Sequence, residues 1–295
     1  TIPSGGFQNG FVTADPVAHR LYVGQQFAGK VLVVEAASDT VLANVAIGGE
    51  CYGVAVDPAR EVLFVCRSHN TILPISTTSL VPGTPIEVGA GLQSLTSIGM
   101  AVDPDDGTLW VRYFPDQIKA IAGGSVIATV GVGSYPMGVC IGSSPKRVFV
   151  ANNWGGSVTA YSPGDGSSET VVTGGNPYGI AFDAASLLLY VANNGGTTVW
   201  VIDSRSMGVV ETISVDSQPS GIAIDPLTHR IYVACLDGAV RVITSDYFNR
   251  APVCEIIAPE AVAEGSPGVV LDGSASYDPD SDPIVSYVWS QISGP

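Results

Sequence analysis

Aspartate is the residue with catalytic or metal-binding potential that recurs most regularly in this chain. Five aspartates each end a short apolar run and precede a polar turn: Asp15, Asp57, Asp103, Asp183 and Asp225. A ring of carboxylates could hold a hard metal ion through its oxygen atoms. Four of the five precede proline, as in DPVAHR, and an aspartate in this position closes a turn by accepting backbone hydrogen bonds. We therefore predict that these aspartates have a structural role.

The other residue types that commonly carry catalysis are sparse. There are three histidines, of which His19 and His229 occupy the same turn position in DPVAHR and DPLTHR, while His69 lies in a different turn. No HxH or HExxH spacing, nucleophile elbow or glycine-rich phosphate loop is present. The sequence thus predicts a protein that is not an enzyme and has no catalytic residues and no organic cofactor.

One candidate metal site lies near the end of the chain. The segment DPDSDP places Asp278, Asp280 and Asp282 at alternate positions, and Asp272 precedes them. In a loop, such carboxylates can converge on calcium, the one metal that the sequence suggests. The alternative is an acidic turn without a metal, because the glycine and the distal glutamate of an EF-hand loop are missing.

The elements that position these residues repeat along the chain. Segments such as CYGVAVDP, SIGMAVDP and PSGIAIDP share a glycine, and these marker glycines are Gly53, Gly99, Gly138, Gly179 and Gly221, at steps of 46, 39, 41 and 42 residues. Phe11 takes the same position in a first, divergent copy. Six copies with a period of about 40 residues indicate a repeat architecture.

Each copy contains four short apolar runs, rich in β-branched and aromatic residues and separated by turns of glycine, asparagine or aspartate. Four-stranded units of this length are typical of a β-propeller, in which blades pack around an axis. Glycine and alanine alternate in the first run, as in Gly179 and Ala181, which suits the crowded strand nearest the axis. We expect an all-β protein with six blades, and a seventh blade upstream is the alternative.

The LYVANN strand and the preceding P-x-G-I-A-x-D-P segment resemble the YVTN family of β-propeller repeats, which occurs in archaeal surface-layer proteins and secreted bacterial proteins. The resemblance covers roughly residues 7 to 246, and the predicted propeller domain is residues 1–250. The first residues, TIPSGG, align with TISVDS, which lies within a fourth strand. Thr1 to Ser4 are therefore expected to complete the sixth blade, which otherwise shows three strands.

Residues 251–295 depart from the repeat. Their VVLDGSASYDPD and YVWSQ segments resemble the beginning of a PKD domain, an Ig-like β-sandwich of extracellular proteins. A whole domain of that family is nearly twice as long, so we expect only a partial sandwich here. Its open edges could pair with strands from elsewhere.

One end of the propeller is expected to collect aromatic rings and amides from the loops: Phe27, Tyr52, Tyr113, Phe114, Asn152, Trp154, Tyr178 and Asn193. Rings stack on sugars and amides form hydrogen bonds, so this face could bind a glycan or a polar protein surface. The alternative is structural: asparagine and glycine form the turns and the aromatic rings cap the blades.

The five cysteines allow two disulfides, which we predict as Cys51–Cys66 and Cys235–Cys254, with Cys140 a buried free thiol. In a reducing compartment all five would be small hydrophobic residues. The net charge of −15 opposes binding to nucleic acid, and no apolar stretch is long enough to span a membrane.

The leading functional hypothesis is a non-catalytic, extracellular or cell-surface protein that builds a fibre or surface layer through contacts with proteins, chiefly copies of itself. The alternative is a secreted recognition module that binds a cell-surface glycan or a protein on the aromatic face. A propeller-type hydrolase or lyase is the third hypothesis. Self-association, glycan affinity and turnover, respectively, would distinguish the three.

Overall fold

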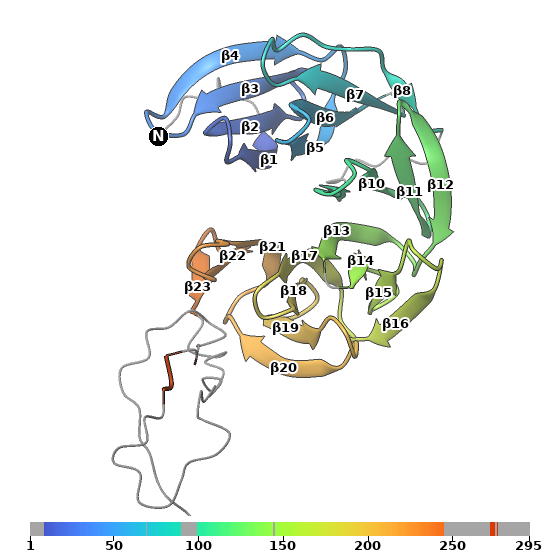
Figure 1. Ribbon diagram of the computed structural model, residues 1–295, viewed down its shortest axis with the longest axis vertical. Coiled ribbons are helices and arrows are strands. Elements are labelled where there is room, and N and C mark those ends of the chain that lie inside the picture. Colours follow the sequence, from blue (N-terminus) through green and yellow to red (C-terminus); the bar gives the residue numbers. More distant parts are fainter. Residues whose placement is uncertain are drawn as a thin grey trace, which may run out of the picture.

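A computed structural model describes residues 9–68, 70–89, 99–143, 145–244, 272–274 and 276. All regular elements in these ranges are β-strands, and they form six antiparallel sheets arranged around an axis (Figure 1). The predicted all-β, six-bladed propeller is therefore confirmed. We number the sheets as blades one to six in chain order.

The first three blades follow the predicted repeats. Blade one contains β1 (Asn9–Asp15), β2 (Arg20–Gln25), β3 (Lys30–Glu35) and β4 (Thr40–Ala46). Blade two contains β5 (Cys51–Asp57), β6 (Val62–Arg67), β7 (Thr71–Ser76) and β8 (Ile86–Glu87). Blade three contains β9 (Met100–Val102), β10 (Leu109–Tyr113), β11 (Gln117–Ala122) and β12 (Ser125–Gly131).

The last three blades continue the series. Blade four contains β13 (Pro136–Ser143), β14 (Lys146–Asn152), β15 (Ser157–Tyr161) and β16 (Ser168–Val172). Blade five contains β17 (Pro177–Asp183), β18 (Leu188–Asn193), β19 (Thr198–Asp203) and β20 (Val209–Ser214). Blade six contains β21 (Pro219–Ile224), β22 (Ile231–Cys235) and β23 (Val240–Ile243). The fourth strand that Thr1 to Ser4 were expected to add to blade six lies outside the described residues, as does nearly all of the predicted sandwich.

The first strand of each blade lies nearest the axis, and glycine lets neighbouring first strands approach closely. A Cβ atom on Gly138 would lie 2.5 Å from the carbonyl oxygen of Tyr178 in the next blade, and one on Gly179 would lie 2.5 Å from that of Ser220. Real Cβ atoms do not come this close to other heavy atoms. The marker glycines are therefore needed where one first strand packs against the backbone of the next.

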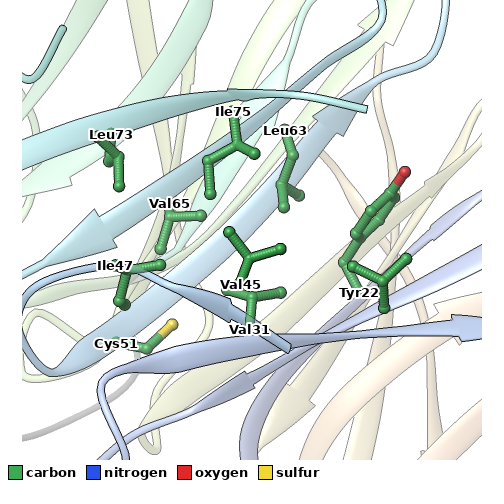
Figure 2. Close-up of a cluster of buried hydrophobic side chains, with 10 residues drawn as sticks. Tyr22, Val31, Val45, Ile47, Cys51, Leu63, Val65, Leu73 and Ile75 are labelled. Atoms are coloured by element: carbon green, nitrogen blue, oxygen red, sulfur yellow. The ribbon is translucent and has the colours of Figure 1, made fainter. Parts of the chain in front are cut away.

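Hydrophobic clusters join each blade to the following one. Figure 2 shows the cluster between blades one and two, where Tyr22, Val31 and Val45 pack against Leu63 and Ile75. Equivalent clusters join blades two and three, three and four, four and five, and five and six. These clusters cover both faces of the second and third strands of a blade in the middle of the series. The second strand of blade five, β18, is therefore buried along its whole length. Outer strands such as β12 alternate between exposed and half-buried residues.

The two ends of the series differ from these five junctions. Neighbouring first strands contact one another from β1 to β21, but among the described residues no extended contact joins β21 to β1. Figure 1 shows the sheet of blade six and the sheet of blade one as the two ends of the series. Each therefore has one face that no hydrophobic cluster of the described residues covers.

Candidate functional site

Asparagine side chains build the turns between the second and third strands of blades four and five. Asn152 is fully buried, and its Nδ2 donates hydrogen bonds to Thr159 Oγ1 at 2.9 Å and to Ser157 Oγ at 3.2 Å. Asn193 is also buried; its Oδ1 accepts a hydrogen bond from the backbone of Asn176 at 3.1 Å. Both predicted binding residues thus have their amides engaged inside the protein.

The second asparagine of each VANN segment links neighbouring blades. Asn153 Nδ2 donates to the carbonyl oxygen of Pro177 at 3.1 Å, and Asn194 Nδ2 donates to that of Pro219 at 3.1 Å. Each acceptor begins the first strand of the next blade. The repeated asparagine pair therefore fixes the hairpin and its position against the following blade.

Three aromatic side chains form a continuous group at this end of blades three and four, which we call the aromatic platform: Phe114, Tyr135 and Trp154. The rings of Tyr135 and Trp154 are stacked, with centroids 4.2 Å apart and planes at 11°. Phe114 meets Tyr135 edge-on, with centroids 5.7 Å apart. Trp154 keeps 69% of its surface exposed and Phe114 is also exposed. The platform thus combines tight internal packing with an open outer surface.

A buried cation lies next to the platform. The guanidinium carbon of Arg112 is 5.9 Å from the centre of the Tyr135 ring, and Arg112 Nη1 donates to the carbonyl oxygen of Pro136 at 3.2 Å. Burial lowers the pKa of Arg112, because removal from water disfavours the charged form. Arg112 and Tyr135 are not among the binding residues predicted from the sequence. Both lie outside the Asn-rich turns, although Tyr135 immediately precedes the first strand of blade four.

The other predicted residues of this face lie apart from the platform. Phe27 is exposed in the corresponding turn of blade one. Tyr52 is buried and donates a hydrogen bond to Glu50 at 2.6 Å; burial and this contact raise the pKa of Tyr52 to about 12. Tyr113 holds Lys119 Nζ 3.6 Å from its ring centre, and Tyr178 lines an axial cavity of about 600 Å³. Of the eight predicted residues, only Phe114 and Trp154 meet in one aromatic group.

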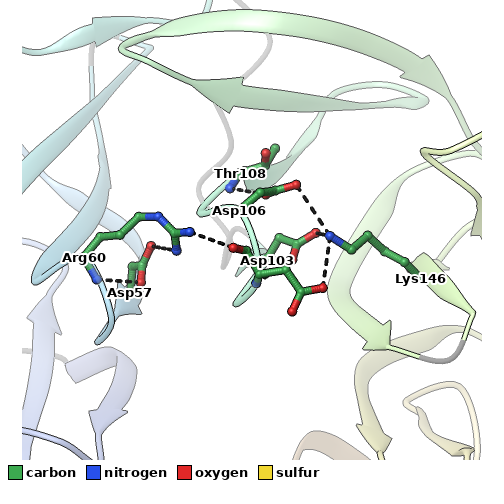
Figure 3. A network of polar contacts seen from close by, with 7 residues as sticks. Asp57, Arg60, Asp103, Asp106, Thr108 and Lys146 are labelled. Atoms are coloured by element: carbon green, nitrogen blue, oxygen red, sulfur yellow. Dashed lines mark hydrogen bonds and ion pairs between the residues drawn. The ribbon is translucent and has the colours of Figure 1, made fainter.

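Charged residues at the opposite end form ion pairs across the blades (Figure 3). Lys146 Nζ lies 2.8 Å from Asp103, 3.2 Å from Asp105 and 3.5 Å from Asp106. The hydrogen bond with Asp103 is the main reason that the pKa of Lys146 is raised above its usual range. Arg60 pairs with Asp57 of its own turn at 3.1 Å and donates a hydrogen bond to the carbonyl oxygen of Asp105 in blade three at 2.8 Å. This network links blades two, three and four.

The remaining regular aspartates accept hydrogen bonds in their own turns. Asp15 Oδ1 accepts from the backbone nitrogens of Val17 and Ala18 at 3.0 and 2.9 Å. Asp225 accepts from Thr228 Oγ1 at 2.6 Å. Asp183 accepts from Ser186 Oγ at 2.6 Å in its own turn and also lies 3.1 Å from His229 Nδ1 of blade six. In the part of the chain that the structure describes, no group of three or more His, Cys, Asp or Glu residues is placed to hold a metal ion.

The predicted calcium site falls largely outside the described residues. Asp278, Asp280 and Asp282 are not among them. Asp272 is exposed and accepts a hydrogen bond from the backbone of Ser274 at 2.8 Å, which lowers the pKa of Asp272. The calcium site therefore stays a prediction.

The described cysteines are free thiols, so the expected Cys51–Cys66 pair is not joined in the structure. A bulge places Cys51 opposite Arg67, whereas Gly53 pairs with Cys66. Cys51 consequently lies in the core toward blade one and Cys66 in the core toward blade three. Burial raises the pKa of Cys51 to about 12. Cys140 is a free thiol as expected, although it is half-buried rather than buried; Cys235 is also free, and Cys254 lies outside the described residues.

Comparison with known proteins does not assign the chain to a family. No protein-family model matches the chain. No curated protein sequence is significantly similar to it. Among the described residues, no helix is long and apolar enough to span a membrane. Functional inference therefore depends on the propeller and its surfaces.

Proposed function

We propose that this protein is a non-catalytic structural component of an extracellular or cell-surface assembly, in which copies contact one another through the ends of the blade series. On this proposal it belongs with YVTN-type repeat proteins, and its C-terminal segment begins a PKD-like domain. The resemblances in the sequence and the scarcity of lysine support an extracellular location. The engagement of the regular aspartates in turns and ion pairs supports a role without catalysis.

The observation that carries the proposal is the face of blade six that no hydrophobic cluster of the described residues covers. Val240 and Val242 point to the same side of β23 and are 61% and 49% exposed, and Ala234 beside them is also exposed. On the other side of the same sheet, Ile231 and Val233 are buried against blade five. Exposed apolar sheet faces of this kind favour association, because burying each valine contributes up to about 1.5 to 3 kcal/mol.

Gly221 indicates what covers this face. It occupies the marker position, yet the nearest atom to a Cβ built on it is the Cβ of Ala234, 3.8 Å away. At Gly138 and Gly179 that space is closed by the first strand of the next blade. A first strand is therefore the best match for the space beside Gly221.

Blade one of a second copy supplies such a strand. Val12 on β1 is exposed, and blade one has no described neighbour on its outer side. Contact between blade six of one copy and blade one of the next joins two different surfaces. A contact of this head-to-tail kind can repeat without closing, which produces a filament.

The test is the assembly state of the full chain, measured by light scattering after size exclusion and by electron microscopy. We expect concentration-dependent oligomers or filaments, and we expect Val240→Glu together with Val242→Glu to shift the protein to monomers. Val172→Glu is the matched control, because Val172 is more exposed but lies on the outer strand of blade four. A monomeric wild type at all concentrations, or equal loss of assembly in the control, would contradict the proposal.

A further inference from the structure

We infer that the outer surface of Trp154 is a stacking site for a neutral saccharide, with the flat C–H face of a pyranose ring as the group recognised. This inference goes beyond the assembly proposed above and does not depend on it, since the platform lies on blades three and four and not at the ends of the series. It takes up one of the two ligand classes that the sequence left open for this end of the propeller.

The platform is held in place before any ligand arrives. The Tyr135 backbone nitrogen donates to the carbonyl oxygen of Pro115 at 2.8 Å, and its own carbonyl oxygen accepts from Asn153 at 2.9 Å. Gly155 donates to the carbonyl oxygen of Ser134 at 3.1 Å. Three loop segments are thus joined by backbone hydrogen bonds around the rings. A fixed ring loses little conformational entropy on binding, which favours affinity.

The surface that Trp154 offers to a ligand is that of a single indole ring. Tyr135 covers the indole on one side at 4.2 Å, and the high exposure of Trp154 shows that much of the rest remains open. Stable protein interfaces bury roughly 800 Å² on each partner, far more than one indole face offers. A sugar ring matches this smaller area. Ser134 is exposed, and its backbone bond to Gly155 places it next to the turn that carries Trp154, so it provides a polar group there.

The charges around the platform favour a neutral ligand. The buried guanidinium of Arg112 near Tyr135 opposes a second cation on the same group of rings, since charges interact strongly where water is excluded. The net charge of −15 opposes an anion. A ring that offers C–H groups to an aromatic face and hydroxyls to polar neighbours satisfies both conditions.

The chain contains a matched control for this site. Phe27 occupies in blade one the turn position that Trp154 occupies in blade four, after Gln25-Gln26 in place of Asn152-Asn153. Phe27 is also exposed, but no described ring packs against it. If exposure alone decided binding, Phe27 would contribute as Trp154 does.

The experiment uses the full chain labelled with 5-fluorotryptophan and titrated with maltotriose, cellotriose, mannotriose and triacetylchitotriose, followed by fluorine NMR. The Trp154 signal is assigned with Trp154→Phe. We expect at least one of these saccharides to shift that signal in the wild type. Affinities of the variants are measured by titration calorimetry, which needs no label at residue 154, and should be reduced at least tenfold in Trp154→Ala, largely kept in Trp154→Phe, and unchanged in Phe27→Ala. Circular dichroism confirms folding of each variant.

Several outcomes would overturn the inference. The first is that none of the four saccharides moves the Trp154 signal, and the second is that binding survives Trp154→Ala or is lost equally in Phe27→Ala. Tighter binding of tetramethylammonium or of sialyllactose than of the neutral saccharides would show that the charge argument fails. Binding of a proline-rich peptide in place of every saccharide would assign the platform to a protein partner.

Discussion

The second and third strands of blades five and six pair in the same register and share several residues, yet their outer faces differ in burial. Val199 and Val201 on β19 are 0% exposed, whereas Val240 and Val242 hold the equivalent positions on β23 and face outward. The first pair packs against blade six. The second pair has no described neighbour.

The difference shows that the position of a blade in the series, and not its repeat sequence, decides how much each residue contributes to the stability of the fold. In repeat proteins, stability is approximately the sum of each unit and its contacts with its neighbours. A residue repeated in every blade is therefore a core residue in the middle of the series and a surface residue at its end. Equivalent substitutions in the two blades measure this directly.

The largest expected contrast concerns a tyrosine of the second strand. Tyr190 is fully buried in the cluster between blades five and six, and Tyr232 is its half-buried counterpart. We expect Tyr190→Ala to lower the free energy of unfolding by about 3 to 5 kcal/mol, because it leaves a large cavity. Tyr232→Ala should cost about 1 kcal/mol or less. Guanidinium unfolding followed by tryptophan fluorescence measures both.

The controls keep the ring and change only the hydroxyl. Tyr190→Phe and Tyr232→Phe should both remain closer to wild type than the alanine variants. The measurement is made on the unassembled protein at low concentration. Equal costs for the two alanine variants would show that the face of blade six is covered within a single chain, and the contrast between the blades would then disappear.

The marker glycines give the second contrast. We expect Gly179→Ala to destabilise the fold by about 1 to 3 kcal/mol, because its Cβ would overlap the carbonyl oxygen of Ser220. Gly221→Ala should be nearly neutral in the monomer, where only Ala234 is near. The same substitution should weaken assembly in light scattering. If Gly221→Ala strongly destabilised the monomer, another part of the same chain would have to pack beside Gly221, which would contradict the proposal that this space is open until a second copy binds.

Sequence reasoning identified the propeller because its signals are local and repeated. Short β-branched runs, turn residues and a glycine recurring about every 40 residues each predict the same architecture. It did not locate the bulges in the first strands, such as the shift between Cys51 and Gly53. A one-residue shift turns a side chain to the other face of a sheet. That shift separates Cys51 from Cys66, which the unbulged strand would place on one side.

The aromatic platform was only partly predictable for a different reason. Trp154 and Phe114 stand out as large residues in turns, but Tyr135 lies in a linker with no repeated pattern, and Arg112 lies in a strand that reads as core. Their contacts arise from three segments that converge in space. Conversely, Asn152 and Asn193 were selected as surface groups, because the sequence does not show that their amides turn inward to Thr159 and Asn176.

The smallest expected effect concerns acid stability, again in blade five. Asp203 accepts hydrogen bonds from the backbone of Ser206 at 2.7 Å and of Arg205 at 3.0 Å, and these bonds lower the pKa of Asp203 below the ordinary value of an aspartate. Blade six has Thr244 at this position and lacks the carboxylate.

A carboxylate whose pKa is lower in the folded state stabilises the fold above its unfolded pKa and loses that contribution as pH falls through the folded value. We therefore expect Asp203→Asn to be less stable than wild type near pH 7, with the difference shrinking below about pH 4. Unfolding midpoints between pH 3 and pH 7 measure this. Ser206→Ala should reproduce part of the change, because it removes the hydroxyl that also bonds Asp203 at 2.9 Å. A difference between wild type and Asp203→Asn that stays constant with pH would show that the turn is held by its backbone alone, and blades five and six would then not differ in acid response at this position.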